Sequence, residues 1–261
     1  MHCGLAVGKL AYHQSLSVGF YQLRSGFIIF NAMRIAAFIS KLFVSILLAL
    51  LSFGFAVATW HEIGVFLSNI NRPIIRLFVD GFLLGLVILP LIYRKISFFT
   101  IFEHELTHML VALMFFKKPR AFLVVEDLGG VVQMTKPGTS DFIITLAPYF
   151  LPTLTLLILP IYAIASPKFK VYIGLLLGFS LAYHLLSNMM EFSYRQSDIK
   201  QMGYFFSTAM FIFGNIFFTG LILALIDGGV HEILAYLKLG FGKNIDLVIY
   251  IKNLIFGKPG T

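Results

Sequence analysis

ISFFTIFEHELTHMLVALMFF, the stretch from Ile96 to Phe116, is apolar enough and long enough to cross a bilayer as one helix. It nevertheless carries two histidines and two acids, Glu103 and Glu105, within six residues. A charged side chain near the centre of a membrane helix costs on the order of 3 kcal/mol. These four side chains therefore need either partners on neighbouring helices or a chemical purpose.

The pentapeptide His104-Glu105-Leu106-Thr107-His108 has the spacing of a zinc site. Side chains at positions i and i+4 lie on the same helix face, so the two imidazoles point the same way, one turn apart. In the H-E-x-x-H pattern both histidines bind zinc and the glutamate acts as general base toward water. We therefore predict that His104 and His108 are metal ligands and that Glu105 is catalytic. The alternative is a pair of buried histidines hydrogen-bonded to neighbouring helices.

Composition places the chain in a membrane. Hydrophobic residues make up 59% of the 261 residues, charged residues only 12%, and the mean hydropathy is +0.90. This composition predicts an all-α, multi-pass integral membrane protein folded as a single membrane-embedded domain, residues 1–261. The net charge of +8 then reflects Lys and Arg at helix ends beside anionic lipid, and no nucleic-acid partner is expected. The single cysteine, Cys3, excludes an internal disulfide and a cysteine-based zinc site.

Apolar segments of suitable length predict about six transmembrane helices. No convincing signal peptide precedes them. Residues 230–256 alternate apolar stretches with lysines and favour a surface-lying or re-entrant helix. The six predicted spans are residues 41–60, 74–93, 96–116, 142–165, 171–190 and 204–226.

Between the third and fourth spans, two β-prone runs, 121–125 and 131–134, flank a segment that ends in Gly129-Gly130. This pattern predicts a short β-hairpin. The hairpin is either an ordinary connection or an open edge on which an extended substrate adds a strand.

Polar and helix-bending residues mark the two spans that follow. Pro148 and Pro152 predict a kink in the fourth span. His184, Asn188 and Glu191 share one face of the fifth span, and we expect this stripe to line a wet cavity.

Two histidines leave a catalytic zinc short of the usual three protein ligands, so a third must come from a distant helix. Two aspartates are candidates: Asp198, which follows the polar stripe, and Asp227, at the end of the sixth span. The fifth span should run in the same direction as the third, which brings Asp198 to the side where the histidine helix exits. Asp227 ends a span that runs the opposite way, and its Gly228-Gly229 also resembles a helix stop.

These features together resemble the site-2 protease family of intramembrane metallopeptidases, the M50 class. The resemblance rests on the H-E-x-x-H motif inside a span, the Gly129-Gly130 hairpin, the proline-containing fourth span and a late aspartate. It implies that His104, His108 and Asp198 bind Zn²⁺ and that Glu105 activates water to hydrolyse a peptide bond within the membrane.

The resemblance also implies a partner and a catalytic core. The substrate would be another membrane protein with a transmembrane segment, cleaved in the lipid bilayer by a core spanning residues 96–203 with helices 96–116, 142–165 and 171–190. The counts of Lys and Arg in alternate loops favour cytoplasmic termini, whereas the resemblance implies the reverse orientation. A different class of function stays open, a non-enzymatic metal transporter or scaffold with a buried His/acid site.

Overall fold

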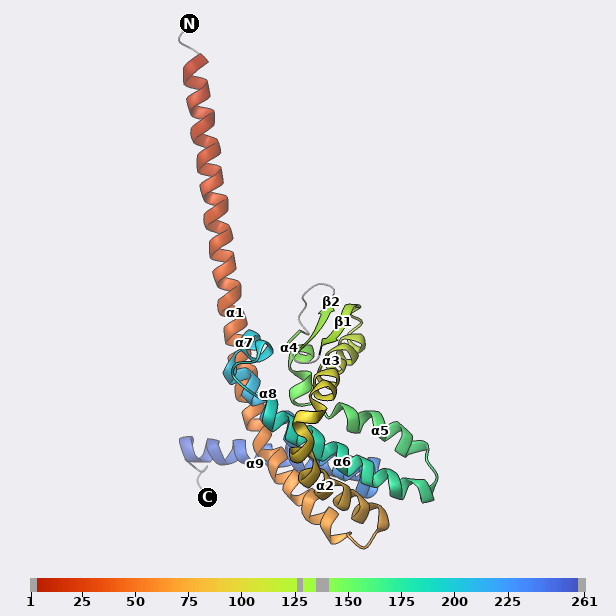
Figure 1. Cartoon of the computed structure of the whole chain (residues 1–261). Coiled ribbons are helices and arrows are strands. Elements are labelled where there is room, and N and C mark those ends of the chain that lie inside the picture. Colours follow the sequence, from red (N-terminus) through yellow and green to blue (C-terminus); the bar gives the residue numbers. More distant parts are fainter. Residues whose placement is uncertain (1–3, 126–128, 135–140, 258–261) are drawn as a thin grey trace. The chain divides into compact units, whose positions relative to one another are not determined.

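The computed structural model describes residues 4–125, 129–134 and 141–257, and these are almost entirely helical (Figure 1). The longer helices follow the apolar segments of the sequence, and one pair of strands interrupts them. In chain order the elements are α1 (Gly4–Ser68), α2 (Pro73–Ile92), the 3₁₀ turn η1 (Tyr93–Ile96), α3 (Ser97–Met114), β1 (Pro119–Val125), β2 (Gly129–Met134), α4 (Asp141–Leu146), the 3₁₀ turn η2 (Ala147–Tyr149), α5 (Thr153–Ile164), α6 (Pro167–Glu191), α7 (Ser197–Met202), α8 (Tyr204–Gly228) and α9 (Val230–Phe256).

Residue contacts divide the chain into two units, Met1–Val44 and Ser45–Thr261. The described part of the first unit is the N-terminal part of α1. The second unit holds the rest of α1 and all the other elements. It therefore contains the second to sixth predicted spans and every candidate site residue.

Helices α2 and α6 pack together along glycines. A methyl group at Gly81 would overlap the carbonyl oxygen of Leu175, and one at Gly178 would overlap the carbonyl oxygen of Phe78. Gly174 lies in the same way against the backbone of Ile74. Small residues four apart allow such close approach of two membrane helices. This contact holds α6, which ends beside the candidate site, against the helix that leads into α3.

One apolar core among the described residues joins α1, α2, α6 and α8. Its buried members are Phe66, Ile75, Phe78, Leu177, Leu181, Ile222, Leu223 and Ile226. A second cluster connects α1 and α8 to α9 and consists of Phe55, Ala58, Ala224 and Tyr236. The hydroxyl of Tyr236 lies 3.1 Å from that of Thr59, so α9 is joined to α1 by a buried polar contact as well.

The prediction of about six transmembrane helices is not confirmed. Among the described residues, four helical stretches are long and apolar enough to cross a membrane: Arg34–Ser68, Pro73–Met114, Pro167–Glu191 and Tyr204–Gly228. The second and third predicted spans run on through η1 as one stretch of 42 residues. That stretch is about 60 Å long at 1.5 Å per residue, roughly twice the thickness of the hydrocarbon core.

The fourth predicted span is broken rather than gently kinked. Phe142–Tyr149 and Thr153–Ile164 meet at an angle of 82° and give a fifth candidate span only if they are counted together. Pro148 and Pro152 flank the break, and each lacks the backbone N–H that would continue the helix. The break turns the chain at Tyr149, next to the histidines.

Strands β1 and β2 pair antiparallel, with Leu123 opposite Val131 and Val125 opposite Gly129. The residues between them, 126–128, lie outside the described part of the chain. The two-stranded sheet packs against α3, so β2 lies beside the helix that carries the H-E-x-x-H motif.

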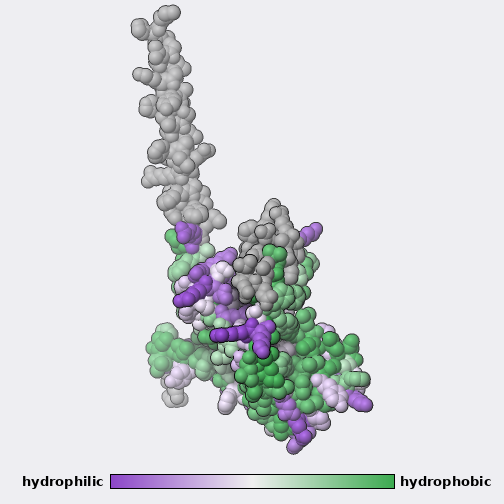
Figure 2. All heavy atoms as spheres, viewed as in Figure 1, coloured by the Kyte–Doolittle hydropathy of each residue, from purple (hydrophilic) through white to green (hydrophobic). Residues whose placement is uncertain are grey.

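Large apolar side chains cover much of the surface. On α2, Leu83, Val87 and Leu91 are exposed, and α5 and α6 present further leucines, isoleucines and aromatics. Figure 2 shows this apolar surface, with hydrophilic patches near α7 and at the turn between α1 and α2. Apolar surface of this extent is stable in contact with lipid and not with water. The chain is a multi-pass integral membrane protein.

Candidate metal centre

Helix α3 presents both histidines on one face, as their spacing predicts. The ring centroids of His104 and His108 lie 4.9 Å apart with the planes 76° to each other. Both side chains are largely enclosed, with 16% and 10% of their surface exposed. Their Nε2 atoms point toward the same carboxylate.

That carboxylate belongs to Asp198, in the first turn of α7. Its Oδ2 lies 3.5 Å from Nε2 of His104 and 3.4 Å from Nε2 of His108. Ligands about 2.0–2.1 Å from a tetrahedral zinc are separated from one another by about 3.3–3.4 Å. Within the described ranges, these three residues are the one group of His, Cys, Asp or Glu side chains arranged to hold a metal ion. The donor set and its spacing therefore fit zinc.

The outward-facing nitrogens of both histidines have partners. Nδ1 of His108 donates to the carbonyl oxygen of Ile144 at 2.7 Å. Nδ1 of His104 lies 3.6 Å from Oε2 of Glu191, whose Oε1 accepts a hydrogen bond of 2.9 Å from the hydroxyl of Tyr93. Partners on Nδ1 orient the rings and leave Nε2 available as a ligand atom, as they do in zinc proteins.

Asp198 lies outside the candidate membrane spans, and its surroundings favour the ionised form. Burial by itself would raise the pKa of the Asp198 carboxyl, but hydrogen bonds and positive charge from His104 and His108 outweigh burial. The pKa therefore lies below its usual range. An ionised carboxylate is the form that binds a metal ion.

Glu105 lies on the neighbouring face of α3, only 8% exposed and covered by β2. A methyl group on Gly130 would overlap Cγ of Glu105 and crowd its carboxyl group. Only glycine allows the strand to lie this close to the glutamate. The second glycine of the predicted hairpin is therefore explained by its contact with the candidate base.

Comparison with known proteins gives one match. Residues 81–190 match the family model described as peptidase M50B-like. The resemblance to the site-2 protease-like M50 family is confirmed. No curated protein and no solved structure matches the chain. The family match indicates a membrane metallopeptidase.

The M50B-like segment contains His104, Glu105 and His108, whereas both aspartate candidates lie beyond its end. The structure brings Asp198 to the histidines and holds Asp227 elsewhere. Oδ1 of Asp227 accepts hydrogen bonds of 2.8 Å from Arg72 and 3.0 Å from Asn69. Arg72 also donates to the carbonyl oxygen of Asp227 at 2.6 Å. Asp227 thus connects the end of α8 to the turn between α1 and α2.

Two members of the polar stripe form a hydrogen-bonded support, and the wet cavity stays a prediction. His184 and Asn188 are 5% and 4% exposed, and the Asn188 amide lies 3.0 Å from Nε2 of His184. The same amide donates to the carbonyl oxygen of Tyr149 at 3.0 Å. Glu191 is the one member of the stripe that contacts a candidate ligand.

Sequence reasoning missed Tyr149, Tyr93 and Asn215 as members of this region. The amide of Asn215 donates to the carbonyl oxygen of Tyr149 at 2.9 Å, next to the bond from Asn188. An asparagine in the otherwise apolar segment 204–226 was the available signal, because buried amides in membrane helices require partners. No comparable signal separates Tyr149 or Tyr93 from the other tyrosines in the sequence.

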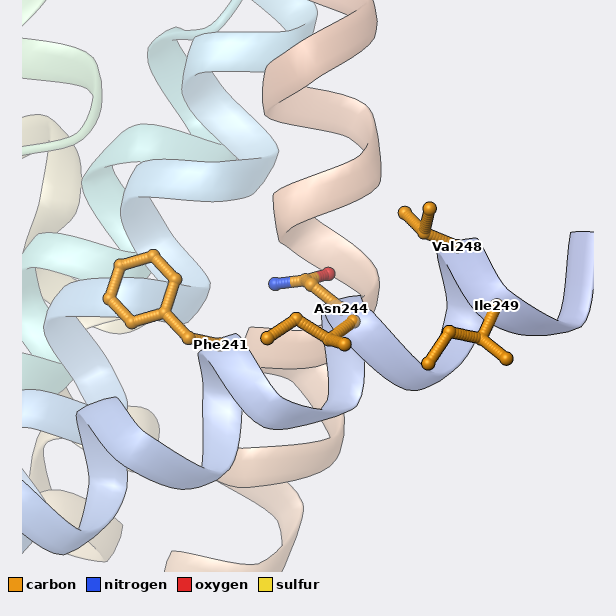
Figure 3. Close-up of a pocket in the computed structure, with 5 residues that line it drawn as sticks. Phe241, Asn244, Val248 and Ile249 are labelled. Carbon is orange, nitrogen blue, oxygen red and sulfur yellow. The ribbon is translucent and has the colours of Figure 1, made fainter. Parts of the chain in front are cut away.

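An apolar hollow on α9 shares no residue with the M50B-like segment or with Asp198. It is lined by Phe241, Asn244, Ile245, Val248 and Ile249 (Figure 3). Asn244 points toward α1 and accepts a hydrogen bond of 3.0 Å from the backbone N–H of Gly54. The rest of the lining is aliphatic or aromatic and offers no chemistry for hydrolysis.

Proposed function

We propose that this chain is a zinc-dependent intramembrane endopeptidase that hydrolyses peptide bonds in or near the transmembrane segments of other membrane proteins. The observation that carries the proposal is the convergence of His104, His108 and Asp198, whose ligand atoms all lie within 4.8 Å of one another, with the carboxylate oxygen 3.4–3.5 Å from each imidazole Nε2. In this proposal the whole chain is one membrane-embedded domain with a catalytic core over residues 96–203.

His104, His108 and Asp198 would hold the zinc ion. When bound, zinc acidifies water and polarises the carbonyl group of the scissile peptide. Glu105 removes a proton from the attacking water and returns a proton to the leaving amine. Glu191 and the carbonyl of Ile144 keep the two imidazole rings oriented. The apolar surroundings strengthen each of these electrostatic interactions, because little water screens them.

The substrate must present an extended peptide. The carbonyl groups of an intact transmembrane helix are shielded by their own hydrogen bonds, so the cleaved segment must unwind locally. The unwound backbone then needs new hydrogen-bond partners in an apolar environment. The β1–β2 sheet supports this role, because among the described residues each of its strands has one edge with no strand beside it.

The unwinding requirement gives the first test of the proposal. We expect Gly, Pro or Asn near the cut in a tagged single-span protein to speed cleavage, and a Leu-rich replacement of the same segment to slow it. A Gly or Pro residue weakens a helix by about 1–3 kcal/mol relative to alanine, which favours the unwound form by about five- to a hundredfold. Cleavage rates of both variants would be measured by co-expression and immunoblotting. If every product were cut in a soluble domain, intramembrane proteolysis would be the wrong reaction.

A second test uses the contact between β2 and the candidate base. Gly130→Val should lower the rate of cleavage by about tenfold or more, since misplacing a catalytic group by about 1 Å costs up to a hundredfold. Zinc content should stay at the wild-type level, because no ligand is changed. Gly64→Ala is the matched control, since a methyl group there meets nothing within 4 Å. Wild-type turnover in Gly130→Val would contradict a close approach of the strand to Glu105 during catalysis.

A further inference from the structure

Tyr149 is a buried tyrosine whose hydroxyl makes no well-formed hydrogen bond. The side chain ends η2, is 2% exposed, and finds no hydrogen-bond partner for its Oη among the described residues. Leaving a buried hydroxyl without a partner costs about 1–3 kcal/mol. Such groups are rare in folded proteins, and a catalytic role is one of the few explanations for them.

The hydroxyl of Tyr149 lies near the candidate metal centre. The ring packs edge-on against His104, with centroids 5.2 Å apart and planes at 80°. The charged groups that act on the hydroxyl most strongly are Asp198, whose carboxylate also comes within reach of a loose hydrogen bond to it, then Glu191, then Glu105. Of these, Asp198 is a candidate ligand, Glu191 contacts the candidate ligand His104, and Glu105 is the candidate base.

The backbone of Tyr149 is fixed in place by hydrogen bonds from two other helices. Its carbonyl oxygen accepts two hydrogen bonds, one from each of the amides of Asn188 and Asn215. The Asn215 amide also donates to the carbonyl oxygen of Phe211 at 2.8 Å, which keeps it in place. A buried asparagine of α6 and a partly buried asparagine of α8 thus hold one residue at the break in the fourth span. This support fixes the position of the ring relative to His104.

We infer that Tyr149 is a further catalytic residue, whose hydroxyl donates a hydrogen bond to the carbonyl oxygen of the scissile peptide as negative charge develops on it. This inference rests on the proposed peptidase function. The hydroxyl keeps its proton throughout, and the proton that reaches the leaving amine still comes from Glu105. A donor that finds its acceptor in the transition state accelerates the reaction more than one that is already satisfied.

Tyr183 provides a matched control. It is also buried, at 4% exposure, and its hydroxyl likewise has no hydrogen-bond partner among the described residues. Its ring packs against Phe99, and the charge that acts on it most strongly is that of Glu103 instead of Asp198. Removal of the Tyr183 hydroxyl therefore controls for the loss of a buried phenol that is influenced most by Glu103 and not by a candidate ligand.

The test compares Tyr149→Phe, Tyr183→Phe and the wild-type chain, each purified at full length in lipid nanodiscs. Zinc content, kcat and KM are measured with a single-span protein that carries Gly-Pro in its transmembrane segment. Binding of a phosphinic peptide, which mimics the tetrahedral geometry of peptide hydrolysis, gives a readout independent of turnover. We expect Tyr149→Phe to lower kcat by about 10²–10³-fold, as for loss of one oxyanion donor. Its KM should change by less than about threefold, and phosphinic peptide affinity should fall roughly in parallel with kcat/KM. Tyr183→Phe should match wild type.

Four results would overturn the inference. Wild-type kcat in Tyr149→Phe would remove the role of Tyr149 and leave the peptidase function standing. Loss of zinc from Tyr149→Phe, or an equal loss of activity in Tyr183→Phe, would show that the hydroxyl has a structural role. If the wild-type chain binds zinc but cleaves no single-span protein, the proposed function fails. Equal binding of the phosphinic peptide to wild type and Tyr149→Phe would then reject the tyrosine separately.

Discussion

Glu105→Gln should leave about one zinc ion per chain and reduce peptide cleavage by about 10²–10⁴-fold. The substitution removes the proton acceptor and changes no ligand, and a general base contributes a factor of this size. Glutamine also preserves the volume of the side chain beneath Gly130, so the sheet need not move. Metal content of the purified chain would be measured by elemental analysis, and cleavage with a tagged single-span protein in the same preparation.

Two controls make the Glu105 result specific. Glu103→Gln changes an acid two residues earlier that is also buried and that accepts a hydrogen bond of 3.3 Å from Thr107. This variant should cleave within a few-fold of wild type. His108→Ala should lose both the metal and the activity, because it removes a ligand. Proteolysis that survives Glu105→Gln, or a metal content unchanged in the double histidine variant, would refute the assignment.

Asp198→Ala should weaken zinc binding by orders of magnitude, whereas Asp227→Ala should bind zinc as wild type does. The first substitution removes one of three ligands from a site in which each ligand is close to the other two. The second removes an acceptor that Arg72 and Asn69 use at the opposite end of α8. Zinc affinity of both variants would be measured by competition with a chromogenic chelator.

Thermal stability should show the reverse pattern. Asp227→Ala should lower the melting temperature, because Arg72 and Asn69 lose a buried acceptor. The loss of stability should be about 1–3 kcal/mol, less than for a fully buried ion pair, since about half of the Arg72 side chain is exposed. Asp198→Ala, measured without zinc, should lose less stability than Asp227→Ala, because the Asp198 side chain is 23% exposed and that of Asp227 only 7%. Full zinc occupancy in Asp198→Ala together with loss of zinc from Asp227→Ala would exchange the roles of the two aspartates.

Local sequence patterns predicted single helices well and their connections poorly. The limits of α2, α6 and α8 follow long apolar runs to within a few residues, because each run has a turn or a helix-starting proline or glycine at its end. The continuity of α2 with α3 was not predicted, since the charged pair Arg94-Lys95 reads as a loop and yet forms the 3₁₀ turn η1. The two prolines of the fourth span indicated a bend, but its angle of 82° depends on what packs around it.

For the candidate site, a short motif was enough to place the histidines but not to select their partner. His104 and His108 share a face through helix geometry alone, whereas Asp198 lies ninety residues later in the chain, and its position depends on how α6 and α7 pack. The predicted direction of the spans favoured Asp198 over Asp227. The hydrogen bonds that Asp227 accepts from Arg72 and Asn69 could not be predicted from the sequence. Tyr149 lacked any sequence signal, because its importance arises from contacts with α3, α6 and α8.

The glycine contacts between α2 and α6 restrict how a substrate could reach the proposed catalytic centre. Gly81 and Gly178 bring backbone against backbone, and the carbonyl groups of Leu175 and Phe78 occupy the space where side chains would otherwise separate the helices. A transmembrane segment about 10 Å across cannot pass between helices in such contact without separating them. This seam is therefore a closed wall, and in the proposed function lateral entry of a substrate from the bilayer must occur on another side.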